Sequence, residues 1–196
     1  LRFLLARSLI KLAIKSEGLK IDSSYQLYNY RQVKLANGHS FYISITHSKQ
    51  FACVLFSNAN VCLGVDIEYH KTRQFLDIAE ANFTKGENMV LKMSKNLTSD
   101  FYKLWTLKEA ITKALNKDLF HVLKQIDCKH MLEHGGGNIE ILGKKIQTVL
   151  ITNTPWQMAV VLESPENKKV DVNFTFNHEV NLDLITQQVE SLGLLR

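Results

Sequence analysis

Alternating hydrophobic and polar residues predict three β-strands in the first third of the chain. Segments 41–48 and 51–57 are rich in β-branched and aromatic residues and are separated by a short turn at residues 48–50. Segment 61–68, Val-Cys-Leu-Gly-Val-Asp-Ile-Glu, alternates strictly. This pattern predicts a strand with one buried hydrophobic face. We expect its other face, with Gly64, Asp66 and Glu68, to be open.

A longer hydrophobic period predicts helices. Residues 100–116 form the clearest one, with leucine or isoleucine at 104, 107, 111 and 115 and with Ser99 or Asp100 as its N-cap. Residues 70–98 also have helical character. We interpret residues 1–17 as an amphipathic first helix that ends at Gly18, although the absence of acidic residues before Glu17 also resembles a presequence.

The remaining segments predict mainly strands. A strand is expected within 28–35, a hairpin that turns at Gly143-Lys144 follows the glycines at 135–137, and another strand begins at Trp156. Strands and helices are therefore mixed, which indicates an α+β fold. We expect two α+β halves, 1–58 and 60–165, followed by a C-terminal extension, 166–196, with no clear element.

Composition narrows the classes of function. The chain has 196 residues, 45% of them hydrophobic, and a net charge of +5, which favours an anionic partner. Basic residues are spread out, so nucleic acid is a weaker candidate than a phosphorylated small molecule or an acidic protein. Cys53, Cys62 and Cys128 lack the spacing of a zinc site or a disulfide framework. No apolar run is long enough to span a membrane, and we expect a cytoplasmic protein.

Two pairs of charged residues are candidates for chemistry. Asp66 and Glu68 lie ~6.5–7 Å apart on one strand face, where they repel each other. They are either a solvated strand edge or part of a site for a cation such as Mg²⁺, which a third acid would complete. On a helical wheel, Glu109 and Lys113 fall on the exposed face as an i, i+4 pair. Such a pair is common on helix surfaces.

Together, these segments resemble the 4′-phosphopantetheinyl transferase superfamily. Val65-Asp66-Ile67-Glu68 matches its G-(V/I)-D-x-E segment, and residues 105–113, Trp-Thr-Leu-Lys-Glu-Ala-Ile-Thr-Lys, match W-(S/T/C)-x-K-E-(A/S)-x-x-K. Residues 45–48, Ile-Thr-His-Ser, are similar to the N-x-S-H-S segment of its longer, surfactin-synthetase-activating type. Residues 2–5 resemble the R-x-L-L helix of that type, and 156–160 lie where its last core strand is expected. The resemblance covers about 1–165.

The resemblance implies the fold, the reaction and the site. The fold would place two similar α/β subdomains in a pseudo-twofold arrangement within a monomer. The enzyme would transfer the 4′-phosphopantetheine group of coenzyme A to a serine of an acidic apo carrier protein. Asp66, Glu68 and Glu109 would hold Mg²⁺. Glu109 would also accept the serine proton, and Lys113 would neutralise the diphosphate. The coenzyme A-binding residues implied by the family are Arg2, Arg31, Thr46, His47 and Lys108.

Two departures from the family pattern leave an alternative open. Residues 31–33 are Arg-Gln-Val where the family usually has Gly-Lys-Pro, and residues 116–119 are Asn-Lys-Asp-Leu where it has Gly-Lys-Gly-Leu. A non-catalytic relative that binds coenzyme A or a carrier protein is therefore a second hypothesis. An unrelated metal-dependent nuclease is a third, which the absence of a basic stripe disfavours.

Overall fold

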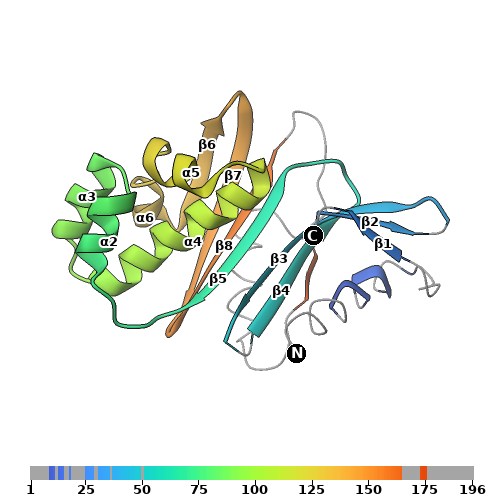
Figure 1. Ribbon diagram of the computed structural model, residues 1–196, viewed down its shortest axis with the longest axis horizontal. Coiled ribbons are helices and arrows are strands. Elements are labelled where there is room, and N and C mark those ends of the chain that lie inside the picture. The colour runs from blue at the N-terminus through green and yellow to red at the C-terminus, as the bar shows by residue number, and fades with distance from the viewer. Residues whose placement is uncertain are drawn as a thin grey trace.

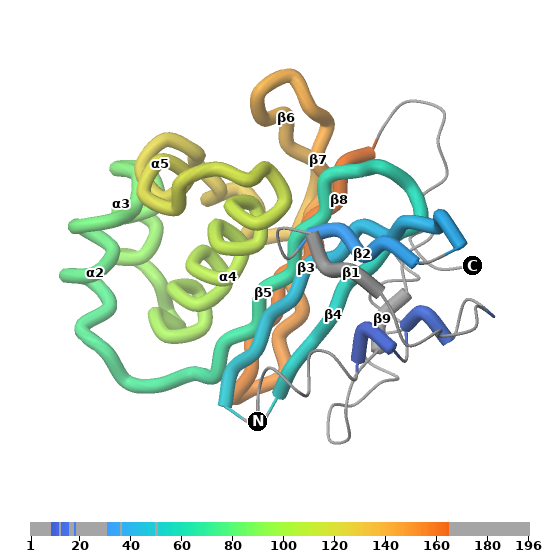
Figure 2. Tube along the Cα trace, turned by 45° about the vertical axis from the view of Figure 1, so that its right-hand side comes forward, coloured from blue at the N-terminus to red at the C-terminus, as the bar shows by residue number. Residues whose placement is uncertain are grey.

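The structure is a computed structural model, and it describes residues 9–11, 13–15, 18, 25–28, 31–35, 37–49, 51–164 and 173–175. Two antiparallel sheets lie beside each other in the centre of the molecule, with helices on the outer side of one of them (Figure 1). Residues 9–11 and 13–15 are helical. They pack on the free face of the other sheet, so that the described part of the chain is layered (Figure 2).

The first sheet has the strand order β1-β2-β3-β4-β9. Its strands are β1 (Tyr25–Tyr28), β2 (Gln32–Leu35), β3 (Ser40–Ser48), β4 (Phe51–Ser57) and β9 (Asn173–Thr175). The prediction of strands at 41–48 and 51–57 is confirmed, with Lys49 at positive φ in the turn between them. The strand predicted within 28–35 is confirmed as β2, whereas its expected start at Tyr28 belongs to β1, with which β2 forms a hairpin.

The second sheet has the strand order β5-β8-β7-β6. Its strands are β5 (Leu63–Tyr69), β6 (Gly136–Ile141), β7 (Lys144–Asn153) and β8 (Trp156–Glu163). The predicted hairpin is confirmed as β6 and β7, and its turn is formed by Leu142 and Gly143, both at positive φ. The division of the chain near residue 59 stays a prediction, and β9 of the extension pairs with β4 of the first sheet.

In the described residues, five helices follow β5, and they lie on one side of the second sheet (Figure 1). They are α2 (Phe75–Asn82), α3 (Lys85–Lys92), α4 (Leu97–Leu115), α5 (Leu119–Gln125) and α6 (Met131–His134). The helix expected over 100–116 is confirmed as α4, but its N-cap is Asn96, whose side chain accepts a hydrogen bond from Ser99 N at 3.2 Å. None of the helices in the described residues is long and apolar enough to cross a membrane.

Strand β5 is buried on both faces. Val61, Leu63, Val65 and Ile67 pack against β4, β7 and β8 in the core between the sheets, as the alternation predicts. The opposite face is covered by α4. A Cβ at Gly64 would overlap the carbonyl oxygen of Ala110 and lie 2.8 Å from Ala114 N. The prediction of an open face is therefore wrong, because Gly64 gives room to the backbone of α4 and not to a ligand.

The N-terminal prediction is confirmed where it can be followed. Gly18 has φ +71° and its N–H donates to Lys15 O at 3.0 Å, which is how a helix ends at glycine. Leu9, Ile10, Ala13 and Ile14 pack against β3 and β4. Arg2 lies outside the described residues.

Candidate metal centre

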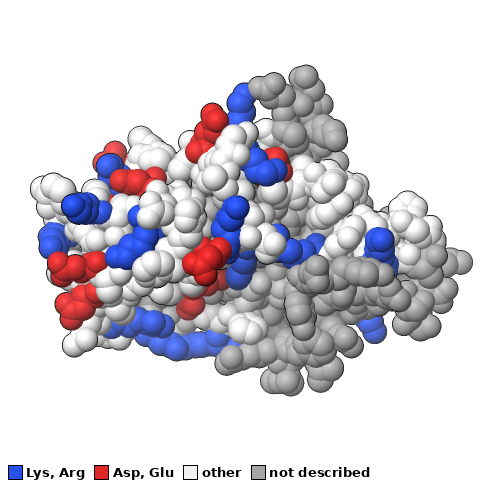
Figure 3. All heavy atoms as spheres, turned by 45° about the horizontal axis from the view of Figure 1, so that its top comes forward, with Lys and Arg blue, Asp and Glu red and all other residues white. Residues whose placement is uncertain are grey.

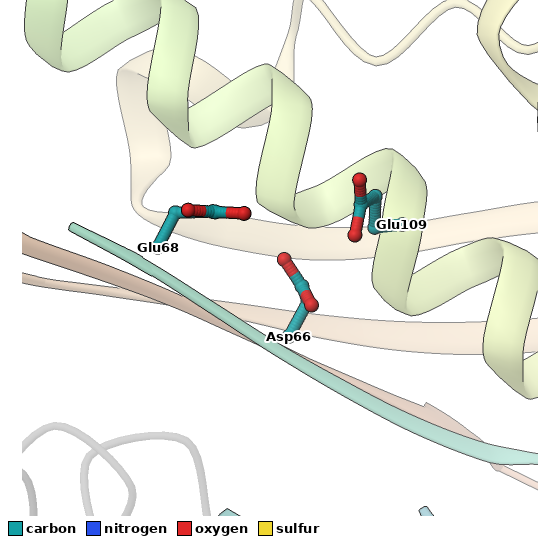
Figure 4. Close-up of side chains that lie close together, drawn as sticks. All are labelled: Asp66, Glu68 and Glu109. Atoms are coloured by element: carbon teal, nitrogen blue, oxygen red, sulfur yellow. The ribbon is translucent and has the colours of Figure 1, made fainter. Parts of the chain in front are cut away.

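Three carboxylates meet between β5 and α4. Asp66 and Glu68 come from the strand and Glu109 from the helix, and Figure 4 shows all three pointing toward one another. One oxygen from each lies within 4.8 Å of the others. The structure therefore brings together the three residues that the resemblance assigns to a metal. The helix approaches the strand closely where Gly64 faces Ala110, the residue after Glu109, and this contact sets the separation between α4 and β5.

Asp66 presents one paired and one unpaired oxygen. The residue is only 3% exposed. Oδ1 accepts hydrogen bonds from Thr46 Oγ1 at 2.9 Å and from Lys113 Nζ at 2.8 Å, whereas Oδ2 has no partner among the described residues. Burial raises the pKa of Asp66, while Lys113 and the Thr46 hydroxyl lower it. A buried carboxylate oxygen without a partner is costly. A cation bound there would remove this cost.

The negative charge of Asp66 contributes to a raised pKa at both Glu68 and Glu109. Burial, followed by the charge of Asp66, raises the pKa of Glu68, and Ser48, Arg73 and Lys71 lower it. Burial and the charge of Asp66 also raise the pKa of Glu109 to about 7. Hard divalent cations prefer such oxygen ligands. The donor set therefore fits Mg²⁺, for which Asp66, Glu68 and Glu109 would supply one oxygen each.

Lys113 reaches the strand rather than its helical neighbour. Its Nζ donates to Asp66 Oδ1 and, at 3.1 Å, to Val65 O. The predicted ion pair with Glu109 on an exposed helix face is wrong, because α4 is packed between the sheet and the other helices and leaves Glu109 half-buried. Trp105 lies beside Glu109 and stacks on Phe101, which agrees with a packing role.

Lys108 lies apart from the acid triad. Its side chain is 0% exposed, and its Nζ forms an ion pair with Glu87 at 2.9 Å. It also donates to the last carbonyls of α5, including Leu123 O at 2.8 Å and Ile126 O at 2.6 Å. Because the ion-pair and hydrogen-bond partners of this ammonium among the described residues all lie inside the protein, we infer a structural role for Lys108, and its predicted contact with coenzyme A stays a prediction.

The other implied coenzyme A-binding residues are dispersed. His47 is exposed and lies opposite Ala52 of β4. Ala52 faces the N-terminal helical residues, so His47 lies on the opposite face of the first sheet from Thr46. Arg31 is half-buried, and burial lowers its pKa while the nearby Cys62 raises it. Thr46 is buried and contacts Asp66.

Two residues with structural contacts were not predicted from the sequence, one beside the acid triad and one beside Lys108. Ser48 Oγ donates to Glu68 Oε2 at 3.3 Å, and the signal for it is the alternation of hydroxyl side chains along β3. Glu87 is the partner of Lys108, and the Thr84-x-x-Glu87 spacing indicates a capping box, which the structure shows at the start of α3. That spacing does not reveal that Glu87 also accepts from Cys128 N at 2.8 Å.

The Asn-Lys-Asp-Leu departure from the family pattern has a local explanation. Asn116 ends α4 in the left-handed conformation, with φ 53° and ψ 46°, and asparagine adopts this conformation more readily than most residues. Asp118 then caps α5 by accepting a hydrogen bond from His121 N at 3.1 Å. The segment therefore forms a tight turn between two helices without glycine.

A comparison with known protein families matches the segment that contains this site. A family model described as the 4′-phosphopantetheinyl transferase superfamily matches residues 62–161, which run from the start of β5 through α4 to β8 and include all three acids. The chain belongs to this superfamily. The predicted membership is thereby confirmed at the level of the superfamily, and the surfactin-synthetase-activating subtype stays a prediction.

The chain was also compared with solved protein structures. The chain resembles the crystal structure of the Thermotoga maritima holo-[acyl-carrier-protein] synthase with 17% sequence identity and a TM-score of 0.36. The match covers 54% of this chain and 65% of that chain. Among curated proteins, no match is found.

Proposed function

We propose that this superfamily member transfers the 4′-phosphopantetheine group of coenzyme A to a serine of an apo acyl or peptidyl carrier protein. The products would be the holo carrier and adenosine 3′,5′-bisphosphate. The observation that carries this proposal is the acid triad, with its unpaired and buried Asp66 oxygen, inside the segment that matches the family. The alternation of β5 explains why two of these acids share one face.

Mg²⁺ bound by Asp66, Glu68 and Glu109 would supply positive charge to the diphosphate of coenzyme A as the phosphoryl group is transferred. Glu109 would also accept a proton from the carrier serine, directly or through a water, because its carboxylate lies at the metal centre where the serine would attack. Two of the three N–H donors of Lys113 are used by Asp66 and Val65. The third is available to a diphosphate oxygen.

The charge of the chain suits an acidic carrier protein. The net charge is +5, and the positive charges of Lys71 and Arg73 act on Glu68 at the end of β5. Figure 3 shows Lys and Arg side chains intermingled with Asp and Glu on the face it presents, rather than a surface of a single sign. This arrangement favours a docked protein or a small phosphorylated ligand over a nucleic acid. The roles of His47 and Arg31, a monomeric state and a cytoplasmic location stay predictions.

The test is a transfer assay. The full chain is incubated with coenzyme A, Mg²⁺ and several apo carrier proteins, and the carriers are weighed by mass spectrometry. We expect a gain of one phosphopantetheine unit, which a chelator and the Glu109→Gln variant abolish. Glu133→Gln makes the same chemical change on an exposed side chain and should leave transfer intact.

Two negative outcomes separate the alternatives. Tight binding of coenzyme A by calorimetry, with no mass gain on any carrier, would favour a non-catalytic relative. Mg²⁺-dependent nicking of a plasmid would favour a nuclease. The position of Glu109 and Lys113 on helix α4 disfavours this alternative. Asn116 and Asp118 form regular helix ends, so this departure has a structural explanation that does not require a loss of catalysis.

A further inference from the structure

A row of hydroxyl groups joins the two sheets beside the acid triad. Strand β5 is the edge strand of its sheet, so alternate backbone N–H groups along it have no strand to pair with. Three of them donate instead to hydroxyl oxygens of β3: Val65 N to Ser44 Oγ at 3.0 Å, Ile67 N to Thr46 Oγ1 at 3.2 Å and Tyr69 N to Ser48 Oγ at 3.2 Å. We call Ser44, Thr46 and Ser48 the hydroxyl ladder.

Two members of the hydroxyl ladder also contact carboxylates. Thr46 Oγ1 donates to Asp66 Oδ1 at 2.9 Å, and Ser48 Oγ donates to Glu68 Oε2 at 3.3 Å. A hydroxyl has a single proton, and here its oxygen already accepts a backbone N–H. The proton is therefore directed toward the carboxylate. Ser44 contacts no carboxylate among the described residues, although it accepts a backbone N–H in the same way.

These contacts determine which carboxylate oxygen remains for a ligand. Thr46 and Lys113 both donate to Asp66 Oδ1, so Oδ2 of this buried residue has no partner in the described part of the chain. Figure 4 shows one Asp66 oxygen directed toward Glu68 and Glu109. Thr46 is itself only 5% exposed, so it is placed to orient Asp66 and not to contact a bound coenzyme.

We propose that Thr46 and Ser48 are positioning residues, which hold Asp66 and Glu68 in the orientation that binds a divalent cation. The inference rests on the proposed function only through the metal centre. Groups that orient metal ligands by hydrogen bonding typically change metal affinity by about 10–100-fold when they are removed. The shorter contact of Thr46 and the deeper burial of Asp66 predict a larger effect for Thr46 than for Ser48.

The test measures Mg²⁺ affinity without any transfer reaction. Magnesium chloride is titrated by calorimetry into the chelator-treated full chain and its variants. Thr46→Val keeps the shape of the side chain but removes the hydroxyl, and we expect about tenfold weaker Mg²⁺ binding or more. Thr46→Ser should restore the affinity, and Ser48→Ala should weaken binding by a few fold.

Ser44→Ala is the matched control, because it removes a hydroxyl from the same ladder and leaves a β5 N–H unpaired without touching a carboxylate. Its Mg²⁺ affinity should equal that of the wild type, even where its free energy of unfolding in urea falls. If Thr46→Val does not fold, the comparison of Ser48→Ala with Ser44→Ala decides. Equal affinities across the wild type, Thr46→Val and Ser48→Ala overturn the positioning role alone. A wild-type chain that binds no Mg²⁺ overturns the metal centre as well.

Discussion

The Glu109→Gln substitution should stabilise the metal-free protein while it abolishes transfer. In the folded chain, burial and the charge of Asp66 raise the pKa of Glu109 from 4.5 to about 7. Each tenfold change in proton affinity corresponds to about 1.4 kcal/mol. Ionising Glu109 therefore costs about 3 kcal/mol more in the folded state than in the unfolded chain. Glutamine keeps the shape of the side chain without the charge, so it removes this cost.

The stability difference between Glu109→Gln and the wild type should grow as pH rises. Because the folded-state pKa is raised, the folded chain binds the proton more tightly, and stability is lost as pH rises from 4.5 through about 7. At pH 8, in the presence of a chelator, we expect the free energy of unfolding of Glu109→Gln to exceed that of the wild type by up to about 3 kcal/mol. At pH 5 the difference should be below about 1 kcal/mol. Urea denaturation followed by circular dichroism measures both values.

In the presence of Mg²⁺ at pH 8, the wild type should have the larger free energy of unfolding and the Glu109→Gln variant the smaller. The ion binds the folded wild type and stabilises it, whereas the variant lacks one of the three carboxylates. Glu133→Gln serves as the control, because its side chain is exposed and lies outside the triad, and it should shift stability little at either pH. A Glu109→Gln difference of equal size at pH 5 and pH 8 would refute the argument that the ionisation of Glu109 is the cause.

Three further predictions concern the scaffold, and each is checked by urea denaturation. Gly64→Ala should lower the free energy of unfolding by about 3 kcal/mol or more, because its methyl group meets the α4 backbone at Ala110, and a loss below about 1 kcal/mol would contradict this packing. Lys108→Met should cost about 3–5 kcal/mol by leaving the Glu87 carboxylate buried and unpaired, and a second change, Glu87→Gln, should recover part of that loss. Asn116→Gly should be tolerated within about 0.5 kcal/mol, whereas Asn116→Val should cost about 1–2 kcal/mol because valine resists the left-handed conformation.

The strands could be predicted because hydrophobic and polar residues alternate along them. The alternation of β5 correctly separated Val65 from Asp66, and the helical period of α4 was also clear. The sequence could not show what covers the second face of β5. Glycine at 64 is compatible with a close ligand or with a close backbone, and only the packing of α4 distinguishes them.

The acid triad depended on a different kind of information. A helical wheel placed Glu109 on the surface because it assumes one buried stripe, whereas α4 contacts the sheet on one side and α2, α3 and α5 on others. The resemblance to known motifs supplied the third acid that the wheel had assigned to solvent. The hydroxyl contacts of Thr46 were not predictable, because they depend on how the two sheets pack against each other.

The two lysines of α4 show why motif residues need a structural context. Lys108 and Lys113 lie five positions apart on one helix, yet Lys108 pairs with Glu87 away from the sheet and Lys113 with Asp66 on β5. With Asp66, Glu68 and Glu109 ionised, the ion pair with Lys113 leaves two negative charges, because Lys71 and Arg73 act on Glu68 without forming an ion pair with it in the described residues. A divalent cation neutralises that remainder, whereas a monovalent cation leaves one uncompensated charge in a half-buried site. Charge balance therefore favours a divalent ion here, independently of the family to which the chain belongs.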